Sequence, residues 1–152
     1  MIRRRFAVRL LAALLVLPWL APSGLGQGPL ADGDAAEVRQ AVDGDTVILA
    51  DGREVRLVGL QAPKLALGRK DFKDWPLAEE SKRAVEALVL GKRVTLRYGG
   101  TRIDRHGRAL AHLTRDDGLW IQGEMLRQGQ ARVYTFPDNR ALAAEMYALE
   151  AE

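Results

Sequence analysis

The 152-residue chain is 47% hydrophobic and 28% charged, which suits one domain with a packed core and is too short for two comfortable domains. It has no cysteine, so a disulfide framework and a thiolate metal site are excluded. Its formal net charge of +3 includes four arginines among the first nine residues; beyond residue 26 there are nineteen basic and twenty acidic side chains, so net charge identifies no partner.

The N-terminal segment has the three parts of a secretory signal peptide. Basic residues in Met1–Arg9 precede the apolar run Leu10–Ala21, and the small residues of Ser23–Gly26 follow. The apolar run is shorter than the roughly 20 residues of a membrane-spanning helix. We therefore expect residues 1–26 to be removed and the protein to be exported, to the periplasm or outside the cell. An uncleaved membrane anchor is the alternative, and Arg3–Phe6 resembles the twin-arginine export pattern.

Residues 27–35 are rich in Gly, Pro and Asp and predict a flexible lead, so the domain is expected to span residues 36–152. Alternating apolar residues predict short strands at its start. Asp51-Gly52 separates two of them, Thr46–Ala50 and Arg53–Leu60, and this dipeptide favours the tight turn of a β-hairpin.

Further along the chain, a helix is predicted from about Pro76 to Leu90, with Gly91 as its stop signal. The remaining elements are two strands, a helix, an extended piece and a final amphipathic helix: Lys92–Tyr98, Arg108–Thr114, Leu119–Gln128, Ala131–Phe136 and Asn139–Glu152. The early strands are too close for helical crossovers. This spacing predicts a small barrel with flanking helices rather than a parallel sheet.

Four ordered segments resemble the signatures of the staphylococcal-nuclease-like (thermonuclease) family. They are Val42–Val47 (VDGDTV), Val55–Pro63 (VRLVGLQAP), Asp104–Arg108 (DRHGR) and Glu124–Gly129 (EMLRQG). The similarity covers roughly residues 36 to 150. The resemblance implies a mostly β fold, a five-stranded OB-fold barrel with about three helices, and nuclease chemistry on nucleic acid.

In that family a Ca²⁺ ion and two arginines hold the scissile phosphodiester, while a glutamate assists an attacking water. The resemblance makes Asp45 a carboxylate ligand of the ion, Ala62 a backbone-carbonyl ligand and Asp43 a supporting acid. It makes Arg56 and Arg108 the arginines that contact phosphate. Because Arg56 lies on an apolar strand, we expect its charge to point into the barrel and to need a partner.

Two positions depart from the family pattern Asp-(Thr or Ala)-Pro-Glu, since this chain has Gln61-Ala62-Pro63-Lys64. Gln61 can still offer a carbonyl oxygen to a metal but has no charge. Lys64 replaces an acid by a cation, which repels a divalent ion and supplies no base in the family's manner. The family implies a Ca²⁺ cofactor, and these two residues argue against it. Lys64 either contacts phosphate or swings away as an exposed loop lysine.

Nucleic acid is the partner that the resemblance implies. Residues 53–108 have fourteen basic against seven acidic side chains, so one central stretch is basic. Arg105 and His106 lie beside Arg108, and Tyr134 and Phe136 fall near the positions of base-stacking tyrosines. Core packing is the alternative for the two aromatic residues.

The sequence therefore supports an exported, monomeric module that binds phosphodiesters or nucleic acid with weakened or lost hydrolysis. Two alternatives stay open. One is an active, metal-dependent endonuclease for DNA or RNA, and the other is a protein-interaction module of the cell envelope.

Overall fold

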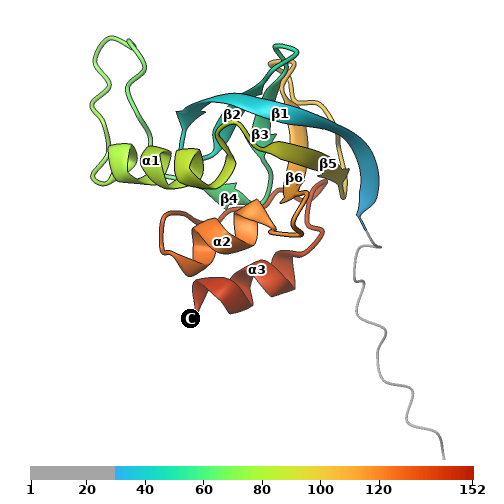
Figure 1. The fold of residues 1–152 in the computed structure, drawn as a ribbon. Coiled ribbons are helices and arrows are strands. Elements are labelled where there is room, and N and C mark those ends of the chain that lie inside the picture. Colours follow the sequence, from blue (N-terminus) through green and yellow to red (C-terminus); the bar gives the residue numbers. More distant parts are fainter. Residues whose placement is uncertain (1–29) are drawn as a thin grey trace, which may run out of the picture.

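The structure is a computed structural model that describes residues 30–152, which form a closed five-stranded barrel with three helices packed around it (Figure 1). This confirms the predicted architecture. The predicted signal peptide and the first three residues of the predicted lead lie outside the described residues. The barrel strands are β1 (Ala31–Asp43), β2 (Thr46–Leu49), β3 (Glu54–Leu57), β5 (Arg93–Tyr98) and β6 (Ala109–Arg115), and a separate two-stranded sheet contains β4 (Leu60–Gln61) and β7 (Arg132–Val133).

The predicted hairpin is present between β2 and β3. These strands pair antiparallel with Val47 opposite Val55, and Gly52 in the turn has a φ of 89°. The barrel then closes through a parallel pairing of β3 with β6, in which Arg56 lies opposite Leu110. That pairing joins segments about fifty residues apart, and it places β3 beside the first residues of β6.

Alternation along β3 decides where Arg56 lies. Val55 and Leu57 are fully buried in the barrel core, whereas Glu54 and Arg56 are half-buried on the opposite face of the strand. The expectation that Arg56 points into the barrel is therefore wrong. Its guanidinium lies outside the barrel core, where it donates to the carbonyls of Leu57 and Leu60 at the end of β3 and just after it.

Strand β1 begins earlier than the sequence suggests. Ala31 already pairs with Tyr98, and Asp32 forms an ion pair with Arg97, whose Nε lies 2.6 Å from Asp32 Oδ1. Residues 31–35 are thus strand rather than flexible lead, because pairing with β5 satisfies their backbone groups. Composition alone missed this, since Gly and Asp are poor strand formers and the pairing partner is distant in sequence.

The three helices are shorter than predicted: α1 (Ala78–Val89), α2 (Ile121–Arg127) and α3 (Ala143–Glu150). The residues before α1 and α3, Leu77 and Leu142, have positive φ values of 64° and 61°, so each helix begins after a non-helical residue. Helix α1 packs against β1, and α2 packs against both β6 and α3 (Figure 1). No helix within residues 30–152 is long and apolar enough to cross a membrane.

One buried amide fixes the chain that leaves β3. Gln122 of α2 donates to the carbonyls of Ala111, at 2.9 Å, and Val58, at 3.4 Å, and accepts from the Leu113 amide at 3.1 Å. A fully buried amide satisfied at both ends holds its neighbours in one arrangement. The Gln122 bonds thereby fasten Val58, just after β3, to β6 and α2.

Candidate functional site

The turn between β1 and β2 holds two buried carboxylates. Asp43 is 6% exposed and Asp45 is 0% exposed, and the Asp45 amide donates to Asp43 Oδ1 at 3.0 Å. Gly44 packs so closely on α1 that a Cβ at this position would lie 2.0 Å from Ser81 Oγ. The Asp-Gly-Asp pattern is thus a tight turn pressed against a helix, and Asp45 has no direct path to water.

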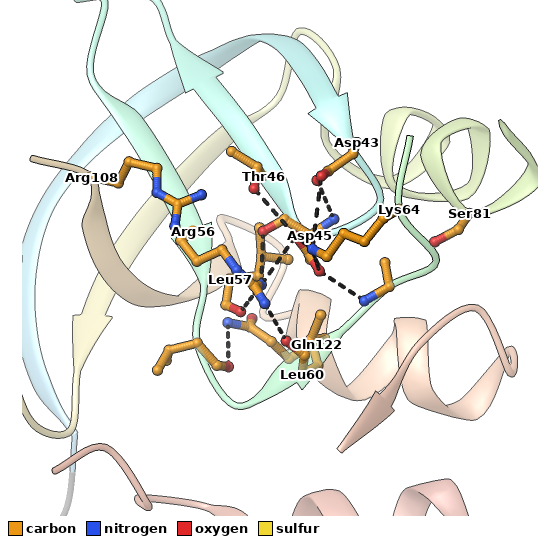
Figure 2. A network of polar contacts seen from close by, with 12 residues as sticks. Asp43, Asp45, Thr46, Arg56, Leu57, Leu60, Lys64, Ser81, Arg108 and Gln122 are labelled. Carbon is orange, nitrogen blue, oxygen red and sulfur yellow. Dashed lines mark hydrogen bonds and ion pairs between the residues drawn. The ribbon is translucent and has the colours of Figure 1, made fainter. Parts of the chain in front are cut away.

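The Asp45 carboxylate is bound on both of its oxygens (Figure 2). Lys64 Nζ lies 2.9 Å from Oδ1 and 2.7 Å from Oδ2, and the Ala62 amide donates to Oδ2 at 2.8 Å. Thr46 Oγ1, at 3.3 Å, and Arg56 Nη1, at 3.2 Å, face Oδ1. Lys64 is therefore neither a swung-away loop residue nor free to grip a phosphate, because its ammonium is the main counterion of a buried acid.

The surroundings shift the pKa values of the two carboxyl groups in opposite directions. Burial, reinforced by the negative charge of Asp45, raises the pKa of Asp43. Burial acts on Asp45 in the same direction, but Arg56, Lys64 and the Ala62 amide outweigh it and hold the pKa of Asp45 below its ordinary value. Asp45 is consequently the stronger acid of the pair, and Lys64 Nζ lies nearer to it, at 2.7 Å, than to Asp43, at 3.9 Å.

Arg56 has a network of partners outside the barrel wall. Its Nη1 donates to the carbonyls of Asp45, at 3.2 Å, and Leu57, at 2.9 Å, while Nη2 donates to the Leu60 carbonyl at 2.8 Å. A guanidinium has five N–H donors, so Nε–H and one Nη2–H remain for a ligand. The carbonyl bonds hold the guanidinium in one orientation, and its side chain keeps 15% exposure.

The Ca²⁺ site implied by the resemblance does not fit this donor set. Calcium takes six to eight oxygen ligands, several of them carboxylate. Here both oxygens of Asp45 already accept hydrogen bonds, and an ammonium group lies against them. No cluster of three or more His, Cys, Asp or Glu side chains suited to a metal occurs in the described part of the chain.

Gln61 has a different partner from the one the resemblance implies. Its Oε1 accepts from Arg132 Nη2 at 3.0 Å, across the pairing of β4 with β7. The oxygen expected to bind a metal is thus engaged by a guanidinium, because the antiparallel register places Gln61 directly opposite Arg132. Gln61 and Arg132 line a hollow of their own.

The two phosphate-binding candidates meet in a cleft of about 490 Å³ beside the end of β3 and the start of β6. Arg56 and Arg108 both line it. Arg108 is 28% exposed, and its Nε lies 2.8 Å from Asp104 Oδ2. Asp104 Oδ1 also accepts from the backbone amides of His106 and Arg108, so this acid shapes the loop and aims the arginine.

Four other predicted residues line the same cleft: Arg105, His106, Tyr134 and Phe136. Arg105 Nε donates to His106 Nε2 at 3.1 Å. The rings of Tyr134 and Phe136 pack edge to face with centroids 5.2 Å apart, and these residues are 43% and 56% exposed. They are therefore surface aromatics beside arginines rather than core residues, which is the arrangement that stacks on bases.

The structure thus separates the predicted site residues into two groups. Arg56, Arg108 and the four residues just described line the open cleft. Asp43, Asp45, Ala62 and the partly exposed Lys64 form a cluster in which Asp45 contacts Arg56, and Gln61 lies apart from both groups, in the hollow with Arg132. Arg132 was missed by sequence reasoning, although the alternation of Arg132, Tyr134 and Phe136 on one face was a readable signal.

Comparison with known proteins gives one family match and several similar relatives. Residues 54–152 match the family described as staphylococcal nuclease homologue. A protein of Escherichia coli O157:H7 described as an uncharacterized endonuclease is 35% identical over 100 residues, which is 64% of this chain and 59% of that protein. A probable staphylococcal-like nuclease of Oryza sativa subsp. japonica, CAN1, is 33% identical over 93 residues, 61% of this chain and 25% of that protein. The match thus spans less than two thirds of either relative.

Proposed function

The chain belongs to the staphylococcal nuclease homologues, and from this premise we propose that it binds nucleic acid phosphodiesters in the Arg56–Arg108 cleft, with metal-dependent hydrolysis weakened or lost. The proposal that the cleft binds nucleic acid rests on six predicted residues that line it, three of them arginines and two of them exposed aromatics. Arginine matches the geometry of phosphate oxygens, and aromatic rings stack on bases of any sequence.

The single observation that carries the loss of hydrolysis is the position of Lys64. Its ammonium binds both oxygens of Asp45, which the family resemblance makes a metal ligand. An ammonium that donates to a carboxylate has no lone pair with which to take a proton from water. Lys64, at the position of the acid that would help generate the nucleophile, is therefore a counterion in this chain. The negative charge of Asp45, which would hold the metal ion, is already balanced by its ammonium.

In this proposal each cleft residue acts on the ligand directly. Arg56 offers its two remaining N–H donors to a phosphate from a fixed orientation, and Arg108 offers those not directed at Asp104. Tyr134 and Phe136 stack against bases, and Arg105 and His106 lie beside the bound nucleic acid strand. Such contacts position a phosphodiester without requiring that it be cut.

The experiment is a nuclease assay of the protein on DNA and RNA with Ca²⁺, Mg²⁺ or Mn²⁺, beside the double variant Gln61→Asp, Lys64→Glu. We expect no cleavage by the wild type and cleavage by the double variant. Binding, measured separately by fluorescence anisotropy, should weaken with salt and be lost in the variant Arg56→Ala, Arg108→Ala. Wild-type cleavage as fast as that of the double variant would overturn the proposed loss of hydrolysis.

The second candidate is an active metal-dependent endonuclease, and the description of both relatives as nucleases favours nuclease activity. The same assay decides between the two candidates. Metal-dependent cleavage by the wild type that disappears in Asp45→Ala would support the endonuclease, because Lys64 would then have to release Asp45 to a metal.

We also propose that the protein acts after export and removal of residues 1–26, and that the exported form is a monomer. The order of basic, apolar and small residues supports the first point. Intact mass of the protein recovered from the cell envelope or medium tests the cleavage, and light scattering tests the monomer. Recovery of the uncleaved chain, or a dimer at micromolar concentration, would contradict the corresponding statement.

A further inference from the structure

A second hollow lies next to the cleft and has no role in the function proposed above. Its volume is about 310 Å³, and Gln61, Trp75 and Arg132 are among the residues that line it, together with the segment Gly129–Ala131 after α2. Trp75 is 42% exposed, and its amide donates to the Lys64 carbonyl at 2.9 Å. The backbone thus anchors a large aromatic ring beside a concave surface.

Arg132 gives this hollow an uncompensated positive charge. Its Nη2 donates to Gln61 Oε1, which is neutral, and no carboxylate pairs with Arg132 among residues 30–152. Gln61 therefore orients the guanidinium without cancelling its charge. A family aspartate at this position would neutralise Arg132, so the substitution that removes a metal ligand also leaves a cation ready for an anion.

The chain at β7 connects the hollow to the cleft. Arg132, Tyr134 and Phe136 are exposed, whereas Val133 between them is buried and Thr135 is half-buried. Alternate residues of an extended chain lie on one face, about 7 Å apart. Tyr134, which follows β7, lines the cleft and Arg132 lines the hollow, so exposed side chains of one continuous segment border both.

We propose that the Trp75–Arg132 hollow is a second nucleotide-binding subsite, in which Arg132 contacts a phosphate and Trp75 stacks on a base of a single-stranded nucleic acid that continues from the cleft. This inference rests on the proposed function, since it extends the same bound strand. The occupant is single-stranded because a base can stack on an exposed ring only when it is unpaired. Charge complementarity at Arg132 and continuity along β7 select nucleic acid over an apolar partner.

The test compares two probes, a fluorescein-labelled thymidine trinucleotide, which fills the cleft, and an oligothymidylate of about twelve nucleotides, which reaches both subsites. The wild type should bind the longer probe more tightly. Trp75→Leu should weaken binding of the longer probe about tenfold and leave the trinucleotide unchanged, while Trp75→Phe restores most of the affinity. Arg132→Gln should also reduce the salt dependence of the longer probe by about 0.7 in log–log slope.

Matched controls remove similar groups elsewhere. Tyr147→Leu deletes an exposed aromatic ring on α3, and Arg93→Gln deletes an exposed charge on β5. Both should bind the longer probe like the wild type. If Trp75→Leu and Arg132→Gln also bind like the wild type, the second subsite is refuted while the cleft survives. If the wild type binds neither probe, the proposed function itself fails.

Discussion

Replacing Lys64 by methionine tests the ion pair on which the proposed function depends. The change keeps the length and apolar stem of the side chain and removes only the ammonium. Asp45 would then lose the group that lies 2.7 Å and 2.9 Å from its oxygens, while it keeps Arg56 at 3.2 Å and the Ala62 amide. A buried carboxylate would become only partly compensated.

The magnitude follows from charge and burial. Two unit charges about 2.8 Å apart attract by about 6 kcal/mol at an effective dielectric constant of about 20. Relief of the lysine's desolvation, its 22% exposure and the remaining Arg56 partner reduce that figure. We expect Lys64→Met to lower the free energy of unfolding by about 2 to 3 kcal/mol, near the low end for breaking a buried pair.

The assay is urea unfolding at neutral pH, in a cycle of Lys64→Met, Asp45→Asn and the double variant. The two single changes should be non-additive, with a coupling free energy of about 2 kcal/mol. Lys73→Met, a change of an exposed lysine in the following loop, is the matched control and should be nearly neutral. A loss below about 0.5 kcal/mol for Lys64→Met, with additive single changes, would show that the ammonium does not stabilise Asp45.

Three further predictions concern the turn, a buried histidine and metal ions. Gly44→Ala should destabilise the fold by about 1 to 3 kcal/mol, because its Cβ would meet Ser81 Oγ at 2.0 Å; a neutral effect in thermal unfolding would disprove the close contact. Burial lowers the pKa of His112 to about 4 from 6.5, so the unfolded chain takes up the proton first as pH falls, and up to about 3 kcal/mol of stability present above pH 6.5 should be lost by about pH 4. His112→Phe should flatten that part of the pH profile in urea titrations, and an unchanged profile would contradict the assignment. Millimolar Ca²⁺ should leave the wild-type melting temperature unchanged and raise that of Gln61→Asp, Lys64→Glu, whereas a wild-type increase abolished by EDTA would reveal a seated ion.

The sequence predicted those parts of the fold that depend on short, contiguous sequence patterns. The Asp51-Gly52 turn determined the β2–β3 hairpin, and the four ordered motifs implied the barrel and its helices before any pairing was known. The parallel pairing of β3 with β6 was not accessible, because it joins segments about fifty residues apart and no local pattern records it. The same limit hid the early start of β1, whose partner lies on β5.

The candidate site shows the same division between local and long-range information. The resemblance identified six of the residues that line the cleft, since each lies in or near a short family signature. It did not determine what Lys64 and Gln61 do, because their partners, Asp45 and Arg132, are nineteen and seventy-one residues away. A substitution at a motif position shows what is lost, and only the folded contacts show what replaces it.

Charge explains why the two substitutions belong together. Without a metal and without Lys64, the buried Asp45 carboxylate would have Arg56 as its only cationic partner. Lys64 supplies the second positive charge from within the chain. An aspartate at position 61 would add an anion next in sequence to Ala62, whose amide binds Asp45, whereas Gln61 adds none and instead orients Arg132. Reversing the charge of Lys64 alone would place a third acid beside Asp43 and Asp45 with only Arg56 as a counterion, so we expect Lys64→Glu to be unstable and to cleave no nucleic acid. Adding Gln61→Asp to this variant should give cleavage of nucleic acid only when a divalent ion is present. Cleavage by the single variant Lys64→Glu would show that the two positions are independent.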